Sequence, residues 1–386
     1  MASVKKASGL AVMGLAAALA LTGCGSSTPS GGDGKSPLII GTTDRVSTLD
    51  PAASYDNGSY TVEIQVFQFL YGFKPGDVTP QPDAAESCEF AEPTVVQCKI
   101  KPGLKFANGH DLTASDVKFS YDRQVAIEHP NGPASLLANL VKVELVDDLT
   151  VDFHLEAAND QTFLQVVATP VGPIVDEEVF SATGLTTDEE IVSANAFSGP
   201  YTITSFKIND LITFAPYADY NGVQGTVANG GITLKTYSEA TNLKLAIANG
   251  EIDVAYRSLT PTDITDLDKN YPDVTVYKGA GGEIRYMVFN LNTMPGDTPE
   301  QKLAVRQAIA SVVDRDELAE VVYNDLYTPL CSWVPDGQAG ANQAACDTYP
   351  LDLTAAAQYL SDAGLTVPVT LDLQYCPDHY GTTSDQ

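Results

Sequence analysis

The sequence predicts an α/β protein built from more than one domain. Its 386 residues exceed the ~150 of a typical single domain, so two to three domains are expected. Within the block 198–256, residues that alternate between apolar and polar predict strands at 202–206, 212–217 and 251–256. A helix is expected before the last of these strands. The predicted order is therefore two paired strands, a further strand, a helix and a strand.

Local signals define the ends of that helix. Ser238 is expected to be its N-cap, because a serine side chain accepts hydrogen bonds from the first free backbone N–H groups. Leu243, Ala246 and Ile247 share one helix face. The dipeptide 249–250, Asn-Gly, supplies the left-handed residue that ends helices. Elsewhere, Val62 to Leu70 predicts an amphipathic helix.

The chain is strongly acidic, and this excludes one class of function. Acidic residues outnumber basic ones 50 to 21, which gives a formal net charge of −29. Nucleic-acid binding needs a basic surface and is therefore excluded. The charge favours either a cationic ligand or the solubility of an exported protein, and the second interpretation explains it without a specific ligand.

The N-terminus has the pattern of an export signal. Two lysines, Lys5 and Lys6, precede an apolar stretch from Gly9 to Leu21 that is too short to span a bilayer. Residues 21–24, Leu-Thr-Gly-Cys, resemble a bacterial lipobox. We therefore expect residues 1–23 to be a signal peptide, Cys24 to be lipidated, and the Gly/Ser/Pro-rich residues 24–37 to be a flexible tether. The alternative is an ordinary secretory signal followed by an incidental cysteine.

The sequence contains no recognisable catalytic motif. None of its four histidines has the spacing of a helical metal-binding pair, and neither a nucleophile elbow nor a phosphate loop is present. No cofactor and no metal are predicted. A pair of acidic residues for glycoside hydrolysis remains open, so a secreted hydrolase is the second hypothesis and a purely structural surface lipoprotein the third.

Several spaced motifs resemble one family. They include Ser-Gly-Pro-Tyr at 198–201, Tyr-Asn-Gly at 220–222 and Ala-Ile-Ala-Asn-Gly-Glu-Ile-Asp-Val at 246–254. This pattern is similar to the family 5 extracellular solute-binding proteins, the peptide and nickel receptors of ABC importers. The resemblance implies an α/β, two-lobed fold of the type II periplasmic-binding-protein kind, with an extra domain inserted in the first lobe.

The resemblance also implies domain boundaries. The first lobe is expected at 38–73 and 191–283, the inserted domain at 74–190 and the second lobe at 284–386. Family members continue beyond this length, so we expect the second lobe to be incomplete. An incomplete lobe predicts low solubility and weak peptide binding for residues 24–386.

In such a receptor a ligand binds in a cleft between the lobes, which close about a hinge. The expected ligand is a peptide, with nickel chelates, haem and oligosaccharides as alternatives. The expected partners are an ABC permease and its ATPase, and the receptor is expected to be a monomer. The loop 55–59 has a second interpretation as a solvated N-cap loop. The candidate ligand-binding residues are Tyr55, Asp56, Asn57, Tyr256, Arg257, Arg285 and Tyr286.

Three further expectations concern strands, a helix and cysteines. Residues 284–290 predict a buried strand, which the resemblance makes a hinge, and 369–375 predict another strand. Val117, Tyr121 and Val125 are expected to share the buried face of a helix that a Thr113–Asp116 capping box begins. Disulfides are expected for the exported protein, with two free core cysteines as the alternative for the first pair. The pairs are Cys88 with Cys98 and Cys331 with Cys346, which leaves Cys376 alone.

Overall fold

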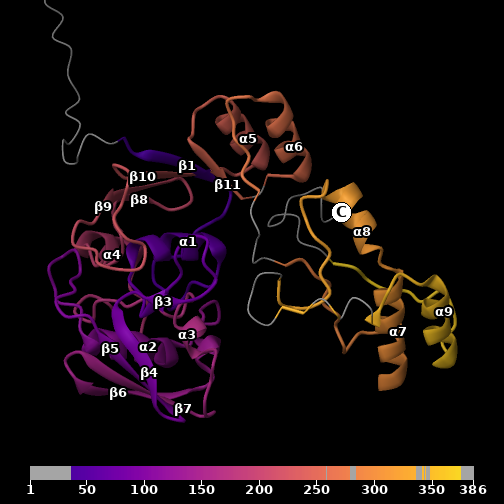
Figure 1. Ribbon diagram of the computed structural model, residues 1–386, viewed down its shortest axis with the longest axis horizontal. Coiled ribbons are helices and arrows are strands. Elements are labelled where there is room, and N and C mark those ends of the chain that lie inside the picture. Colours follow the sequence, from indigo (N-terminus) through magenta and orange to yellow (C-terminus); the bar gives the residue numbers. More distant parts are fainter. Residues whose placement is uncertain are drawn as a thin grey trace, which may run out of the picture. The chain divides into compact units, whose positions relative to one another are not determined.

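A computed structural model of the chain describes residues 36–257, 259–278, 284–335, 341–342, 344 and 348–374 (Figure 1). The expected signal peptide, Cys24, Cys346 and Cys376 lie outside these residues. Within the described part of the chain, no helix is long and apolar enough to cross a membrane.

One five-stranded sheet contains the central block of the sequence. Its strand order is β11-β1-β10-β9-β8. The strands are β1 (Leu38–Thr42), β8 (Tyr201–Lys207), β9 (Leu211–Pro216), β10 (Ile232–Thr236) and β11 (Val254–Tyr256). β1 pairs in parallel with both β10 and β11, whereas β8, β9 and β10 pair antiparallel. Successive side chains of a strand point to opposite faces of the sheet, so a strand that alternates apolar and polar residues places all its apolar side chains on one face.

Helices cover both faces of β1. Ile40 packs in the core cluster that includes Val62 and Val66 of helix α1 (Asn57–Val66). Its neighbour Ile39 points to the opposite face and packs with the cluster of helix α5 (Ala240–Ala248). A Cβ at Gly41 would lie only 2.7 Å from Leu243 Cδ1 of α5, so the close approach of this helix favours glycine there. Helix α6 (Pro261–Asn270) follows β11.

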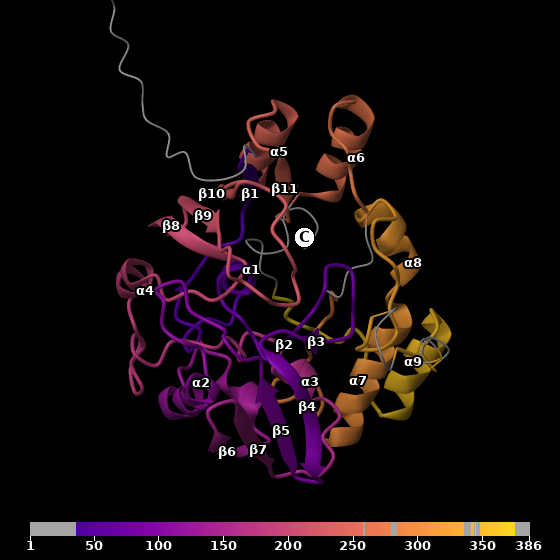
Figure 2. The same ribbon diagram turned by 60° about the vertical axis from the view of Figure 1, so that its left-hand side comes forward.

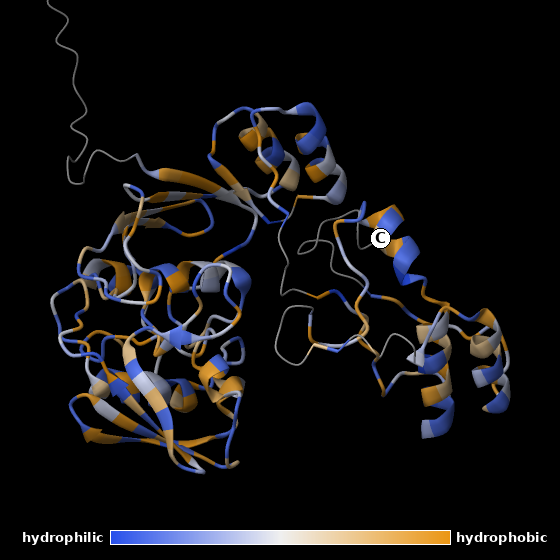
Figure 3. Ribbon diagram, in the orientation of Figure 1, coloured by the Kyte–Doolittle hydropathy of each residue, from blue (hydrophilic) through white to orange (hydrophobic). Residues whose placement is uncertain are grey.

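A second, four-stranded antiparallel sheet has the order β4-β5-β7-β6. Its strands are β4 (Ala85–Glu92), β5 (Val95–Ile100), β6 (Leu140–Asp147) and β7 (Thr150–Leu155). Figure 3 shows the alternation of apolar and polar residues along these strands, and Figure 2 shows helix α2 (Ala114–Ile127) beside β6 and β7. Val117 and Tyr121 of α2 are buried with Phe153 of β7 in one core. Short strands β2 (Tyr71–Gly72) and β3 (Gln81–Pro82) pair with each other.

A disulfide crosses the β4–β5 hairpin. Cys88 and Cys98 are directly opposed in the strand register, and their sulfur atoms are 2.02 Å apart. The bridge closes a loop over a sequence separation of 10 residues. In the chain-entropy model a loop of this size stabilises the fold by about 2–3 kcal/mol.

The remaining described elements are mostly short. They are η1 (Ala134–Leu137), α3 (Phe163–Val166), α4 (Asp188–Ala194), α7 (Pro299–Val312), α8 (Arg315–Glu317), the π-helical turn η2 (Leu318–Val322) and α9 (Leu353–Asp362). Helices α7 and α9 pack against each other, where Asp352 N donates to Ser311 O at 2.8 Å. The Thr298 side chain caps α7, and Pro299 is its first residue, where the fixed φ of proline suits a helix start.

The structure confirms the predicted order of the central block as β8, β9, β10, α5 and β11. Helix α5 ends as expected, with Gly250 in the left-handed region at φ 69°. The predicted N-cap is wrong by one residue, since Glu239 occupies that position without a side-chain hydrogen bond. The capping box of Thr113 and Asp116 at α2 is present.

Two helix predictions are wrong in part. Helix α1 ends at Val66, because the Val66 carbonyl accepts hydrogen bonds from Ser198 N at 2.9 Å and Gly199 N at 2.8 Å. These contacts divert the chain before Leu70. On α2, Val125 is 53% exposed. Eight residues after Val117 it has turned by about 80° from the buried face, which continues through Gln124 instead.

Two predicted strands are absent from the described residues. Residues 284–290 and 369–374 have no strand structure, and Tyr375 lies outside the description. The side chain of Tyr286 is 60% exposed, and that of Leu373 is also exposed. Alternation predicts a strand only where a neighbouring strand satisfies the backbone hydrogen bonds. No strand in the described part of the chain pairs with either segment.

Candidate ligand-binding site

The carboxyl ends of β1 and β11 meet at one edge of the five-stranded sheet. The two strands are parallel, and Thr42 is paired with Tyr256 at this edge. Ligands of open α/β sheets bind beyond the carboxyl ends of parallel strands. Of the predicted site residues, Tyr256 and Arg257 lie at this edge.

Arg257 is fixed by an ion pair and by its backbone. Its Nε lies 2.9 Å from Oδ2 of Asp44, a carboxylate whose side chain is only 8% exposed. The guanidinium also lies 5.9 Å from the ring centroid of Tyr256, within the range of a cation–π contact. Its φ is 65°, in the left-handed region that residues with a Cβ seldom adopt. Strained backbone of this kind occurs preferentially at ligand-binding and catalytic sites.

The second predicted group, 55–57, begins helix α1. Asp56 is the N-cap and accepts a hydrogen bond from Ser59 N at 2.8 Å. Its second carboxylate oxygen accepts from Ser47 Oγ at 2.6 Å. Tyr55 and Asn57 on either side are exposed. The structure therefore shows the N-cap role that the sequence allowed, while a role of this turn in ligand binding stays a prediction.

One segment, 43–47, joins the two groups. Asp44 pairs with Arg257, and Ser47, three residues later, donates to Asp56. A Cβ at Gly58 would overlap the carbonyl oxygen of Arg45, so glycine allows this segment to approach the first turn of α1. The structure thus brings the predicted residues 55–57 and 256–257 to either side of a single connecting segment.

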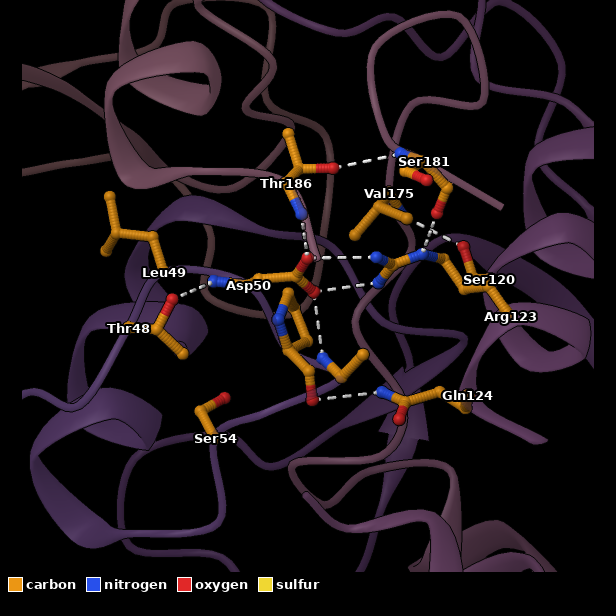
Figure 4. Close-up of polar contacts among 12 residues, drawn as sticks. Thr48, Leu49, Asp50, Ser54, Ser120, Arg123, Gln124, Val175, Ser181 and Thr186 are labelled. Carbon is orange, nitrogen blue, oxygen red and sulfur yellow. Dashed lines mark hydrogen bonds and ion pairs between the residues drawn. The ribbon is translucent and has the colours of Figure 1, made fainter. Parts of the chain in front are cut away.

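The loop before Tyr55 is held by a buried ion pair (Figure 4). Both guanidinium Nη atoms of Arg123, on α2, contact the carboxylate of Asp50, at 2.8 and 2.9 Å. Arg123 Nε also donates to Ser181 O at 3.0 Å, and Thr186 N donates to Asp50 at 2.7 Å. The side chains of the pair are 1% and 0% exposed. Bidentate geometry fixes orientation as well as distance, so this pair positions the loop that leads to Asp56.

A buried carboxyl group lies under the same loop. Glu63 of α1 is 1% exposed, and its Oε1 accepts a short hydrogen bond from Ser54 Oγ. Burial raises the pKa of Glu63 to about 8; the Ser54 hydrogen bond acts in the opposite direction, and the charges of Asp56 and Asp50 add to the increase. Glu63 is therefore protonated and neutral at pH 7.

Arg285 and Tyr286, the remaining two predicted site residues, both contact aromatic rings. The guanidinium of Arg285 lies over the rings of Tyr323 and Tyr327, at 5.5 and 5.1 Å from their centroids. Tyr286 makes an edge-to-face contact with Trp333, with centroids 5.1 Å apart. Arg285 thus makes cation–π contacts and Tyr286 an aromatic contact. The role of these two residues in ligand binding stays a prediction.

Sequence reasoning missed several residues that build this site. The partner of Asp50, Arg123, lies 73 positions away, beyond the reach of any local pattern. Asp44 lies two residues after β1, and a polar residue after a buried parallel strand is the one signal that could have identified it. Within the described residues, no group of three or more His, Cys, Asp or Glu could hold a metal ion.

Comparison with known proteins supplies the family. Residues 79–378 match the model of the bacterial extracellular solute-binding proteins, family 5. The probable D,D-dipeptide-binding periplasmic protein DdpA of Escherichia coli is 24% identical over 347 residues, which cover 88% of this chain and 65% of that protein. The glutathione-binding protein GsiB of Escherichia coli is also 24% identical, over 94% of this chain and 67% of its own length.

Solved structures of this family have the same fold. The substrate-binding protein CtaP of an ABC transporter from Listeria monocytogenes superposes with a TM-score of 0.69 at 24% identity, over 86% of this chain and 66% of its own. The chain thus spans about two thirds of the length of the proteins that it matches. The fold is the mixed α/β fold of type II periplasmic binding proteins. The chain belongs to the bacterial extracellular solute-binding proteins of family 5.

Proposed function

We propose that this protein is the substrate-binding component of an ABC importer and that it captures peptides without catalysing a reaction. The observation that supports this function is the edge where Asp44 and Arg257 form an ion pair beside the turn of Asp56. A receptor needs fixed polar groups at such an edge, whereas an enzyme needs a nucleophile or an acid–base pair aimed at a substrate.

The charges at this edge fit a zwitterionic ligand. A peptide presents a carboxylate, which a guanidinium binds with directed hydrogen bonds, and an ammonium group, which a carboxylate binds. Arg257 is proposed to contact the ligand, and Asp44 to position it. Exposed Tyr55 and Tyr256 provide apolar surface with a polar end for the peptide backbone. The names of the relatives DdpA and GsiB are consistent with small peptide-like ligands.

The test compares variants of the purified chain. Peptides that are retained from a mixed pool are identified by mass spectrometry, and one is titrated to millimolar concentration so that weak binding is detected. Arg257→Gln is expected to raise Kd at least tenfold, because a charge-assisted hydrogen bond contributes about 1.5–3 kcal/mol. Arg306→Gln, on helix α7, removes the same charge elsewhere and should leave Kd within a factor of two.

Two outcomes would contradict the proposal. An equal loss of affinity in both variants would show that net charge, not the edge of the sheet, governs binding. Hydrolysis of the peptides during incubation would favour the enzyme hypothesis instead.

We further propose that the protein works outside the cytoplasmic membrane, held there by a lipid on Cys24 and delivering its ligand to a permease that an ATPase drives. A diacylated cysteine buries enough CH₂ groups to anchor a protein stably, at ~0.8 kcal/mol each. Cys24→Ala is expected to move the protein from the membrane fraction to the soluble or secreted fraction. Unchanged partitioning into detergent would exclude the anchor.

A further inference from the structure

A row of directly opposed residues crosses the five-stranded sheet near the carboxyl end of β10. Lys207 of β8 is paired with Leu211 of β9, which is paired with Lys235 of β10. The row continues to Gly41 of β1. Directly opposed residues point to the same face of a sheet, so both lysines share the face on which Leu243 of α5 covers Gly41.

This face is hollowed beyond α5. A pocket of about 440 Å³ lies over β8, β9 and β10, and both lysines line it. Ser205 lies two residues before Lys207 on β8 and therefore points to the same face, as does Tyr237, whose ring also lies against Gly41. Adjacent opposed residues have Cβ atoms about 5 Å apart, which places the two lysine Cβ atoms about 10 Å apart across Leu211. Their long, flexible side chains can therefore reach a common point from either side.

The charge of the pocket is opposite to that of the chain. The whole protein carries −29, yet the pocket contains two lysines and one acidic residue, Asp210. Lys207 forms an exposed ion pair with Asp210. Lys235, by contrast, makes no side-chain hydrogen bond or ion pair with any other residue that the structure describes. A partly buried lysine without a protein acceptor, beside the hydroxyl group of Ser205, has the donors that an anion requires.

We propose that this pocket binds a compact anion with several oxygen atoms, a phosphate or a dicarboxylate, between Lys207 and Lys235. Lys235 is the principal contact, since Lys207 is already paired with Asp210. The hydroxyl group of Ser205 donates a further hydrogen bond to the anion.

The pocket adjoins the segment 43–47 but is separate from the peptide site. Asn209, at the turn beside Asp210, bonds to both backbone groups of Val46, at 2.8 and 3.2 Å. Tyr237 N donates to Thr42 O at 2.8 Å. Neither Arg257 nor the turn at 55–57 lines the pocket. Anion binding there does not depend on the proposed peptide function, and each can fail without the other.

The test is an anion titration of the purified chain at low ionic strength. Binding is measured by NMR from the backbone amide chemical shifts of Lys235 and Tyr237. Inorganic phosphate and succinate are added in separate arms, because one is a phosphate and the other a dicarboxylate. Saturable shifts in either arm are expected, with the saturating anion identifying the class. Lys235→Gln should weaken binding at least fivefold, and Lys207→Gln by less.

A matched control is Lys142→Gln. Lys142 lies on β6 of the other sheet and pairs with Glu144, much as Lys207 pairs with Asp210, so its loss should leave both titrations unchanged. Thermal unfolding of each variant verifies that the fold is retained. Shifts that stay linear in both arms, or an affinity that survives Lys235→Gln, would overturn the proposal.

Discussion

Replacing Arg123 by methionine is expected to lower the free energy of unfolding by about 3–5 kcal/mol, because the change leaves the carboxylate of Asp50 buried without its cation. The side chain of Asp50 is 0% exposed, so water cannot take the place of the guanidinium. The lost contacts also include the Ser181 carbonyl and the face of Phe180, whose centroid lies 5.3 Å from the guanidinium carbon. A marginally stable domain can be largely unfolded by a loss of this size.

The second variant of this test removes both charges. Asp50→Asn combined with Arg123→Met leaves no unpaired buried charge, so the double variant should be more stable than Arg123→Met alone. Asn at position 50 has one acceptor oxygen, so it can keep one of the two backbone donors of Asp50, either Ala52 N, which binds Oδ1 at 3.0 Å, or Thr186 N, which binds Oδ2 at 2.7 Å. Stability is measured by urea unfolding at constant pH.

Lys118→Met, on the same helix, is the matched control. Lys118 pairs with Asp122 at the surface, where an ion pair contributes between 0 and about 1 kcal/mol. A loss in Lys118→Met equal to that in Arg123→Met would show that helix propensity or net charge, and not the buried pair, determines the result.

The sequence predicted those elements whose signals are local. The β8–β9 hairpin, the capping box at the start of α2 and the glycine stop at Gly250 depend on residues that act on their own backbone within a few positions. The hairpin that aligns Cys88 with Cys98 is local in the same sense. These short-range effects do not need the rest of the fold, and this is why they can be derived from the sequence.

Elements that depend on distant partners were not predictable in this way. Helix α1 stops at Val66 because Ser198 and Gly199, more than 130 positions later, bond to its last carbonyl. The apolar run at 284–290 predicts a buried strand, yet no described strand pairs with it. The buried pair of Asp50 and Arg123 has no periodic signal. Only the three-dimensional fold reveals this pair and the contact between Asp44 and Arg257.

The candidate site likewise contains residues that the sequence predicts and residues that only the fold reveals. Residues 55–57 and 256–257 adjoin a helix and a strand that the sequence predicts, and the structure places them on either side of the segment 43–47. Two of the residues that fix them, Ser47 and Gly58, act through tertiary contacts that no local pattern indicates. The sequence therefore predicts which surfaces carry polar groups better than it predicts what orients those groups.

A second large effect is expected from pH, through Glu63. Its pKa is raised from 4.5 to about 8 in the folded protein, chiefly by burial. Between these two values the unfolded chain releases the proton and the folded chain retains it, so the folded state loses stability as the pH rises through this window. This difference in pKa corresponds to on the order of 4–5 kcal/mol of the free energy of unfolding, and this contribution is lost by about pH 8.

Glu63→Gln should remove this dependence. Glutamine is neutral at every pH and has nearly the same shape, so it retains an oxygen that can accept from Ser54 Oγ. Oε2 of Glu63 has no hydrogen-bond partner among the described residues, and an amide NH₂ in its place loses no existing bond. The variant is expected to match the wild type near pH 5 and to exceed its stability at pH 9.

Glu190→Gln serves as the control, with the opposite sign. Glu190 is an exposed member of the α4 capping box, and the hydrogen bonds from Thr187 hold its pKa below the usual value. Its contribution is present at neutral and alkaline pH and is lost only as the medium becomes acidic, so this variant gains nothing at pH 9. Urea unfolding at intervals from pH 5 to 9 separates the two cases. Parallel stability curves for Glu63→Gln and the wild type would mean that Glu63 is already ionised in the folded protein, with water or a cation reaching its carboxylate beneath the turn of Asp56.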